Sequence, residues 1–197
     1  LPESVTAGGS GKATAAADIA QLTLGVETEG ATTEAAREKN AEAVQAAVDF
    51  LTGMGVAESD IKTERINLGE QYDGGYQMST RMTVLVREVD RAGEAIDGVV
   101  NAGVNNIYDV EYGVADEAAL YEQALENAAA DAKESAQKMA EAAGRTLGDV
   151  ISVEESSYGG ATLVRQQAED GSFTDATLSA PGDLSVTAEV RVIYELK

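Results

Sequence analysis

Apolar and polar residues alternate along several stretches of the chain, and this period of two predicts β-strands. The clearest stretch is residues 20–26, and the longest is residues 184–196. Shorter strands are predicted at residues 4–11, 65–72, 76–87, 107–114 and 150–155. Because only every second side chain is apolar, each strand should have one dry and one wet face, which favours antiparallel pairing.

Three other segments repeat apolar residues every three or four positions, which predicts helices at residues 33–53, 90–103 and 116–144. Thr32 or Thr33 would cap the first helix. The first helix is expected to bury Ala36, Ala43, Ala47, Val48 and Leu51, and the third Tyr121, Leu125, Ala128, Ala132, Ala136, Met139 and Ala143. The order of elements predicts an α+β fold: a largely antiparallel, mixed sheet with two long helices and one shorter helix packed on it.

The chain is interpreted as a single domain over residues 1–197, with a long flexible loop at about residues 157–182. This loop has no sustained period and is rich in Gly, Ser, Ala and Thr, and loops of such length are typically functional or disordered. No run of 18 apolar residues is present, so no transmembrane segment is expected. The chain begins with Leu1 and Pro2, which suggests removal of an upstream segment by a signal peptidase or in preparation.

Acidic residues dominate the charge of the chain: 35 Asp and Glu face 14 Lys and Arg, a formal net charge of -21 with no His and no Cys. The missing side chains exclude Ser-His-Asp triads, cysteine nucleophiles, disulfides and zinc sites built from His or Cys. Such a surface repels nucleic-acid phosphates and anionic lipid. It is typical of a protein from a halophile, where salt screens the self-repulsion, with an acidic mesophilic protein as the alternative.

One glycine-rich run, residues 8–14, invites comparison with a phosphate-binding loop. Thr6 stands where that motif needs a glycine, and Ala13 stands where it needs Ser or Thr. We therefore favour glycines that thin one face of an early strand over a nucleotide site. Asn40 is the one polar residue on the first helix's apolar seam, and we interpret it as a hydrogen-bonded structural residue.

Carboxylates are too frequent in this composition to identify a site by themselves. Asp170 and Asp175 in the long loop are candidate ligands for a hard cation, and Glu154 and Glu155 end a predicted strand. Their spacing fits no EF-hand, so a solvated acidic surface is the favoured interpretation. We predict no catalytic residues, no metal site and no cofactor.

Motifs along nearly the whole chain resemble the SIMPL-domain family. They include the opening residues 5–11, Asp18 to Val26, Gly55-Val56 followed by residues 59–63, Gly75-Tyr76, residues 86–90, residues 103–107, Ala124-Leu125 with Ala128, Asp131-Ala132 and Lys138, residues 147–150, Pro181-Gly182 and the closing residues 194–196. The resemblance implies an exported or envelope-associated α+β protein, of the periplasmic immunogenic and oxidative-stress-defence type. It implies no agreed catalytic activity and supplies no catalytic residues.

The sequence thus favours a non-enzymatic, extracytoplasmic protein that acts through self-association or partner binding, with a link to stress defence. A carboxylate-based hydrolase and a cation-binding module are the alternatives. A homo-oligomer is expected because the strand at residues 184–196 could offer a long edge to another subunit. Alanines on several sides of the third helix, Ala118, Ala129 and Ala140 among them, offer a second surface.

Overall fold

The computed structural model describes residues 3–72, 74–155, 164–165 and 183–197. The chain divides into two compact units. Unit 1 contains β1 (Ser4–Ala16), α3 (Glu117–Ala142), β6 (Leu147–Glu155), β7 (Val164–Arg165) and β8 (Asp183–Leu196). Unit 2 contains β2 (Ile19–Gly30), α1 (Thr33–Gly53), η1 (Glu58–Asp60), β3 (Ile61–Glu70), β4 (Tyr76–Val86), η2 (Val89–Arg91), α2 (Ala92–Ala102) and β5 (Asn106–Gly113).

The predicted α+β class is confirmed, with antiparallel strands, two long helices and one shorter helix. The strands form two sheets rather than one, in the orders β1-β8-β6, with β7 also paired to β8, and β3-β4-β2-β5. The short strand β7 falls within the predicted loop, and the rest of that loop lies outside the described residues. Whether the two units fold as one cooperative domain stays a prediction.

Each long helix begins at a side-chain cap that the sequence supplies. In α1 the Ala35 N–H donates to Thr32 Oγ1 at 3.2 Å, and in α3 the Ala119 N–H donates to Asp116 Oδ1 at 2.9 Å. Such caps satisfy N–H groups that have no partner within the helix. Gly103 ends α2 with a φ of 117°, a left-handed conformation that favours glycine.

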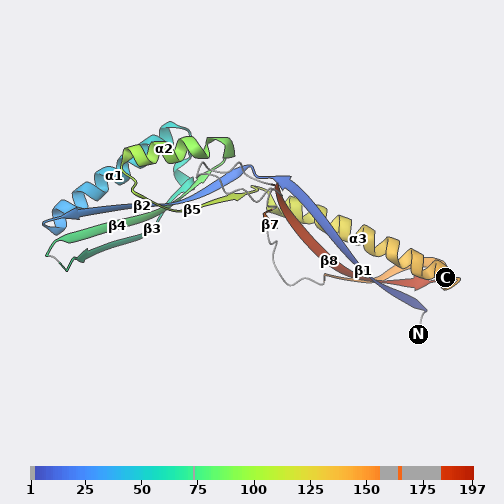
Figure 1. Cartoon of the computed structure of the whole chain (residues 1–197). Coiled ribbons are helices and arrows are strands. Elements are labelled where there is room, and N and C mark those ends of the chain that lie inside the picture. Colours follow the sequence, from blue (N-terminus) through green and yellow to red (C-terminus); the bar gives the residue numbers. More distant parts are fainter. Residues whose placement is uncertain (1–2, 73, 156–163, 166–182) are drawn as a thin grey trace, which may run out of the picture. The chain divides into compact units, whose positions relative to one another are not determined.

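Unit 2 has a core of branched side chains between its sheet and its helices. Figure 1 shows α1 and α2 on the same side of the sheet. From β2, Leu22, Leu24 and Val26 are fully buried against this layer, as are Leu51 of α1 and Val99 of α2. The alternation of apolar residues in the sequence thus puts the dry face of β2 toward the helices.

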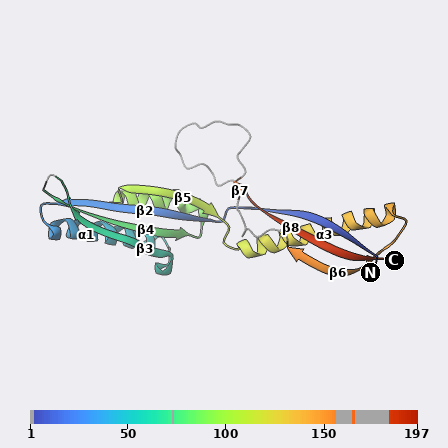
Figure 2. The same cartoon turned by 90° about the horizontal axis from the view of Figure 1, so that it is seen from below.

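Unit 1 is built differently. Its helix α3 lies along β1 and β8 (Figure 2), and the residues between helix and strands are small. The buried stripe of α3 repeats every four residues: Leu120, Ala124, Ala128, Ala132, Ala136 and Ala140. The predicted stripe is correct at its three central alanines and wrong at Tyr121, Leu125, Met139 and Ala143, which are not buried. Only small side chains fit where the helix approaches the sheet this closely, so the larger residues lie beside the contact.

Within the described residues, no helix is long and apolar enough to cross a membrane.

Candidate interaction surfaces

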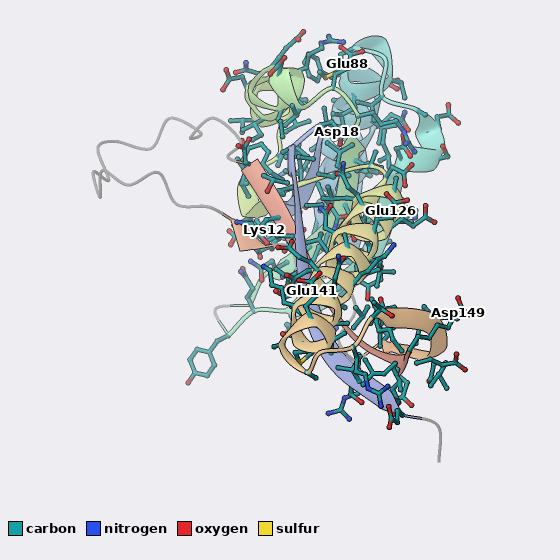
Figure 3. All side chains as sticks on the ribbon, turned by 90° about the vertical axis from the view of Figure 1, so that its right-hand side faces the viewer. Lys12, Asp18, Glu88, Glu126, Glu141 and Asp149 are labelled. Carbon is teal, nitrogen blue, oxygen red and sulfur yellow. The ribbon has the colours of Figure 1, made fainter. Side chains whose placement is uncertain are left out.

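With no His and no Cys in the chain, a metal centre would have to be built from carboxylates and other oxygen ligands. No group of three or more Asp or Glu residues there could hold a metal ion. In Figure 3, Glu126 and Glu141 of α3 and Asp149 of β6 lie at separate places on unit 1, and all three are exposed. Asp170 and Asp175 lie outside the described residues, so their role as cation ligands stays a prediction.

Each unit has a shallow hollow in its described surface that a ligand could enter. One of about 90 Å³ in unit 2 is lined by Asp60, Arg87 and Arg91, but both arginines are engaged in ion pairs with carboxylates. The other, of about 470 Å³ in unit 1, is lined by Ser10, Asp131, Glu189 and Arg191, among others. Asp131 and Glu189 are both exposed there. A hydrolase needs a carboxyl group in an environment that tunes its pKa, and neither hollow provides a buried carboxylate pair.

The glycine-rich run forms part of β1, paired along its length with β8. A Cβ placed on Gly9 would lie 2.1 Å from Ala128 O, and one on Gly11 would lie 2.0 Å from Ala124 O. Both distances are far below van der Waals contact, so the α3 backbone rests on the strand where side chains are missing. This confirms the glycines as a packing feature, and the strand conformation excludes the phosphate-loop alternative.

Asn40 holds together three elements inside unit 2. Its side chain is 1% exposed, and Nδ2 donates to Val26 O at 2.9 Å and to Met78 O at 3.3 Å. Its Oδ1 accepts from Thr80 Oγ1 at 2.6 Å. The predicted structural role of this residue is therefore confirmed, and the contacts join α1 to β2 and β4.

Asp60 and Arg87 form a two-pronged ion pair between η1 and the end of β4. Arg87 Nε donates to Asp60 Oδ2 at 2.7 Å, and Nη2 donates to Oδ1 at 2.9 Å. The Asp60 side chain is 9% exposed. The Arg87 hydrogen bond, opposed by desolvation, lowers the pKa of the Asp60 carboxyl, and the same hydrogen bond raises the pKa of Arg87.

The prediction that residues 184–196 form a free edge is wrong. β8 lies inside its sheet, paired with β1 on one side and with β6 and β7 on the other. Its alternation of apolar residues is the signature of a strand with one buried face, and that pattern does not tell a central strand from an edge strand. Any assembly through strand edges must use other strands.

β1 is an edge strand whose outer side is partly closed by α3. The Ser10 N–H donates to Asp131 Oδ2 at 2.9 Å, and Asn127 Nδ2 donates to Lys12 O at 2.9 Å. These side chains, one helical turn apart, occupy a donor and an acceptor that an added strand would need. Covering an edge in this way is a common protection against unwanted pairing.

β3 is one of the two edge strands of the unit 2 sheet, and β5 is the other. The edge of β3 is open by comparison with that of β1. Nine of its ten residues are exposed, and no described side chain caps its backbone. Ile66 is 59% exposed and Leu68 is 46% exposed. The register pairs these residues with Thr80 and Met78, which places both on the helix side of the sheet. β3 thus presents a long edge with apolar side chains beside it, and no sequence pattern distinguishes this strand from the central ones.

The sequence of this chain is similar to a known family and to several known proteins. The family described as "SIMPL: Protein of unknown function (DUF541)" matches residues 5–194. The chain is 29% identical over 217 residues to the "26 kDa periplasmic immunogenic protein" of Brucella melitensis, covering 100% of this chain and 86% of that protein. It is also 29% identical over 207 residues to the "Uncharacterized protein YggE" of Escherichia coli, covering 100% of this chain and 84% of that protein.

Proposed function

The chain belongs to the SIMPL family, and we propose that it is a non-enzymatic, extracytoplasmic protein that acts by self-association through the edge of β3. The observation that carries the proposal is the exposure of Ile66 and Leu68 beside an uncapped strand edge. A second copy can add its own β3 there, so that backbone hydrogen bonds form and apolar side chains leave water.

A two-fold axis makes this pairing self-complementary. Antiparallel strands centred on Asn67 place Ile66 of one copy opposite Leu68 of the other, so four apolar side chains come together on one face. The contrast with β1 supports this choice, because Asp131 and Asn127 occupy the edge of β1 whereas no described side chain caps β3.

The proposal of export is supported by a relative, whereas the link to stress defence stays a prediction from the sequence resemblance. The Brucella melitensis protein is named periplasmic, and this chain matches 86% of its length. No described feature favours the carboxylate-based hydrolase or the cation-binding module over association. The carboxylates of a hydrolase would have to be Asp131 and Glu189, which line the unit 1 hollow but are both exposed. The strongly acidic surface fits a salt-rich environment, which we propose as the setting in which the protein works.

The test is the solution mass of a variant with Ile66→Lys and Leu68→Lys. Two ammonium groups on the edge should prevent pairing, because adding a strand would bring like charges together and bury them. A matched control is Val100→Lys with Met139→Lys, because these residues lie on helices and are 48% and 42% exposed. The two substitutions add the same charge as those in β3. Light scattering should show a smaller mass for the β3 variant and the wild-type mass for the control.

Both variants should fold, because exposed substitutions usually change stability by about 0.5 kcal/mol or less. Far-ultraviolet circular dichroism verifies this. If the folded β3 variant keeps the wild-type mass, this edge is not the association surface.

A further inference from the structure

The face of the unit 2 sheet opposite α1 and α2 carries a division of charge. No described helix covers this face (Figure 1). Leu22 and Leu24 point to the helices and are fully buried, so Thr23 and the residues paired with it point to the opposite face. The register places Lys62 across from Thr83, and Thr83 across from Thr23, on this open face.

Basic residues occupy the half of the open face formed by β3 and β4. Lys62, Arg65 and Arg81 are all exposed there. Arg65 lies directly across from Arg81, and like charges in such a pair destabilise a sheet. No described carboxylate lies within ion-pair distance of these three side chains, although the chain has 35 acidic residues.

Acidic residues occupy the other half, formed by β2 and β5. Asp109 is paired with Thr23, Glu111 with Gln21, and Glu27 with Ser79, which places all three on the open face. Asp109 and Glu111 are exposed. No described basic side chain forms an ion pair with any of these three carboxylates.

An aromatic ring lies in the middle of this face. Gly25 has no side chain, and a Cβ there would lie 2.6 Å from the Tyr108 ring. The Arg81 guanidinium stands over the same ring, 4.1 Å from its centroid. Tyr108 is 44% exposed. Tyrosine and arginine are enriched at the centres of protein interfaces, and this pair is held in place before any partner arrives.

We propose that this face binds the same face of a second copy, basic half against acidic half, as an interface separate from the β3 edge. A two-fold axis parallel to the strands places β3 and β4 of one sheet over β2 and β5 of the other. The basic half of each copy then faces the acidic half of the other, so every contact between the halves occurs twice. The charge complementarity of the two halves selects a second copy over a partner of uniform charge. The inference rests on the proposed self-association.

The test uses two single variants of the full chain that leave β3 unchanged. Arg81→Glu puts a carboxylate into the basic half, and Asp109→Arg puts a guanidinium group into the acidic half. Each variant alone should weaken association through the face by roughly tenfold or more, because each substitution acts twice across a two-fold axis. Mixing the two variants should restore it, because the introduced carboxylate of one variant then faces the introduced guanidinium group of the other. Sedimentation velocity at one fixed salt concentration measures all three samples.

Matched controls are Arg37→Glu and Glu38→Arg, exposed residues on α1 with the same changes in charge. Weakening by the single variants, with recovery in the mixture and wild-type behaviour in the controls, supports the interface. If the wild type associates and the single variants associate equally well, the face inference is wrong while self-association stands. Weakening without recovery in the mixture also overturns it. A wild type that is monomeric throughout removes both proposals.

Discussion

Both units pack helices against a sheet, but with side chains of different size. Unit 2 places Leu, Val and Met between its sheet and two helices, so the layers are separated by interlocking side chains. Unit 1 places Ala and Gly between β1 and α3, so backbone nearly meets backbone. The first solution tolerates changes in shape when the volume is kept, whereas the second has no space for an added methyl group.

The largest effect is expected from Gly9→Ala in β1. The new Cβ would lie 2.1 Å from Ala128 O and 2.4 Å from Ala132 N, so the helix must move away from the strand. We expect a loss of about 3 kcal/mol or more in the free energy of unfolding, measured by urea denaturation. Hydrogen exchange should show the loss of protection in β1 and α3 before it appears in β2 and β4.

Gly8→Ala is the control for this prediction, because it is the same substitution one residue away on the opposite face. The nearest atom to its Cβ would be Val190 O at 3.9 Å, an ordinary contact. Its stability should stay within about 0.5 kcal/mol of the wild type. Equal stability of the Gly9 and Gly8 variants would contradict the close contact between α3 and β1.

The next largest effect is expected in unit 2, from Asn40→Ala. This change leaves Val26 O, Met78 O and Thr80 Oγ1 without their buried partner. We expect a loss of about 2–4 kcal/mol in unfolding free energy, since unsatisfied buried groups cost about 1–3 kcal/mol each and some will find water. Asn101→Ala, exposed on α2, is the control. A loss as small as that of the control would mean that the network adds nothing to unit 2.

Salt should stabilise both units. Glu34, Glu38 and Glu42 are spaced one helical turn apart on α1, as are Glu122 and Glu126 on α3. Each like-charged pair opposes its helix by about 0.2–0.5 kcal/mol until it is screened. Salt at 1 M shortens the screening length to about 3 Å, so thermal midpoints should rise between low salt and molar KCl. A midpoint that does not change would contradict the halophilic interpretation.

A smaller effect, confined to unit 2, is expected from Asp60→Asn at neutral pH. The Arg87 hydrogen bond lowers the native pKa of Asp60. The ionised carboxylate therefore stabilises the fold at pH values above the ordinary aspartate pKa of about 4. This contribution is lost as pH falls through the lower native pKa. The variant should therefore melt below the wild type at neutral pH, and the difference should shrink in acid. A difference independent of pH would contradict the assigned charge interaction.

Local features were the most predictable from sequence. The cap at Thr32, the glycines of β1 and the role of Asn40 all depend on neighbouring residues or on one periodic pattern, which can be recognised in the sequence. The order of strands within a sheet does not depend on such local patterns. The edge predicted at residues 184–196 is therefore wrong, because β8 is a central strand, whereas β3 is an exposed edge strand. The open face of unit 2 was missed because its charges lie on four strands far apart in sequence.

The mass of the wild-type protein in molar salt tests self-association most directly. Salt at this concentration screens the repulsion between chains of formal charge -21, while apolar contact and backbone pairing at β3 persist. Light scattering across micromolar concentrations should give a mass of at least two chains. A monomeric mass over the whole range would contradict the account and would favour the alternative of a carboxylate-based hydrolase.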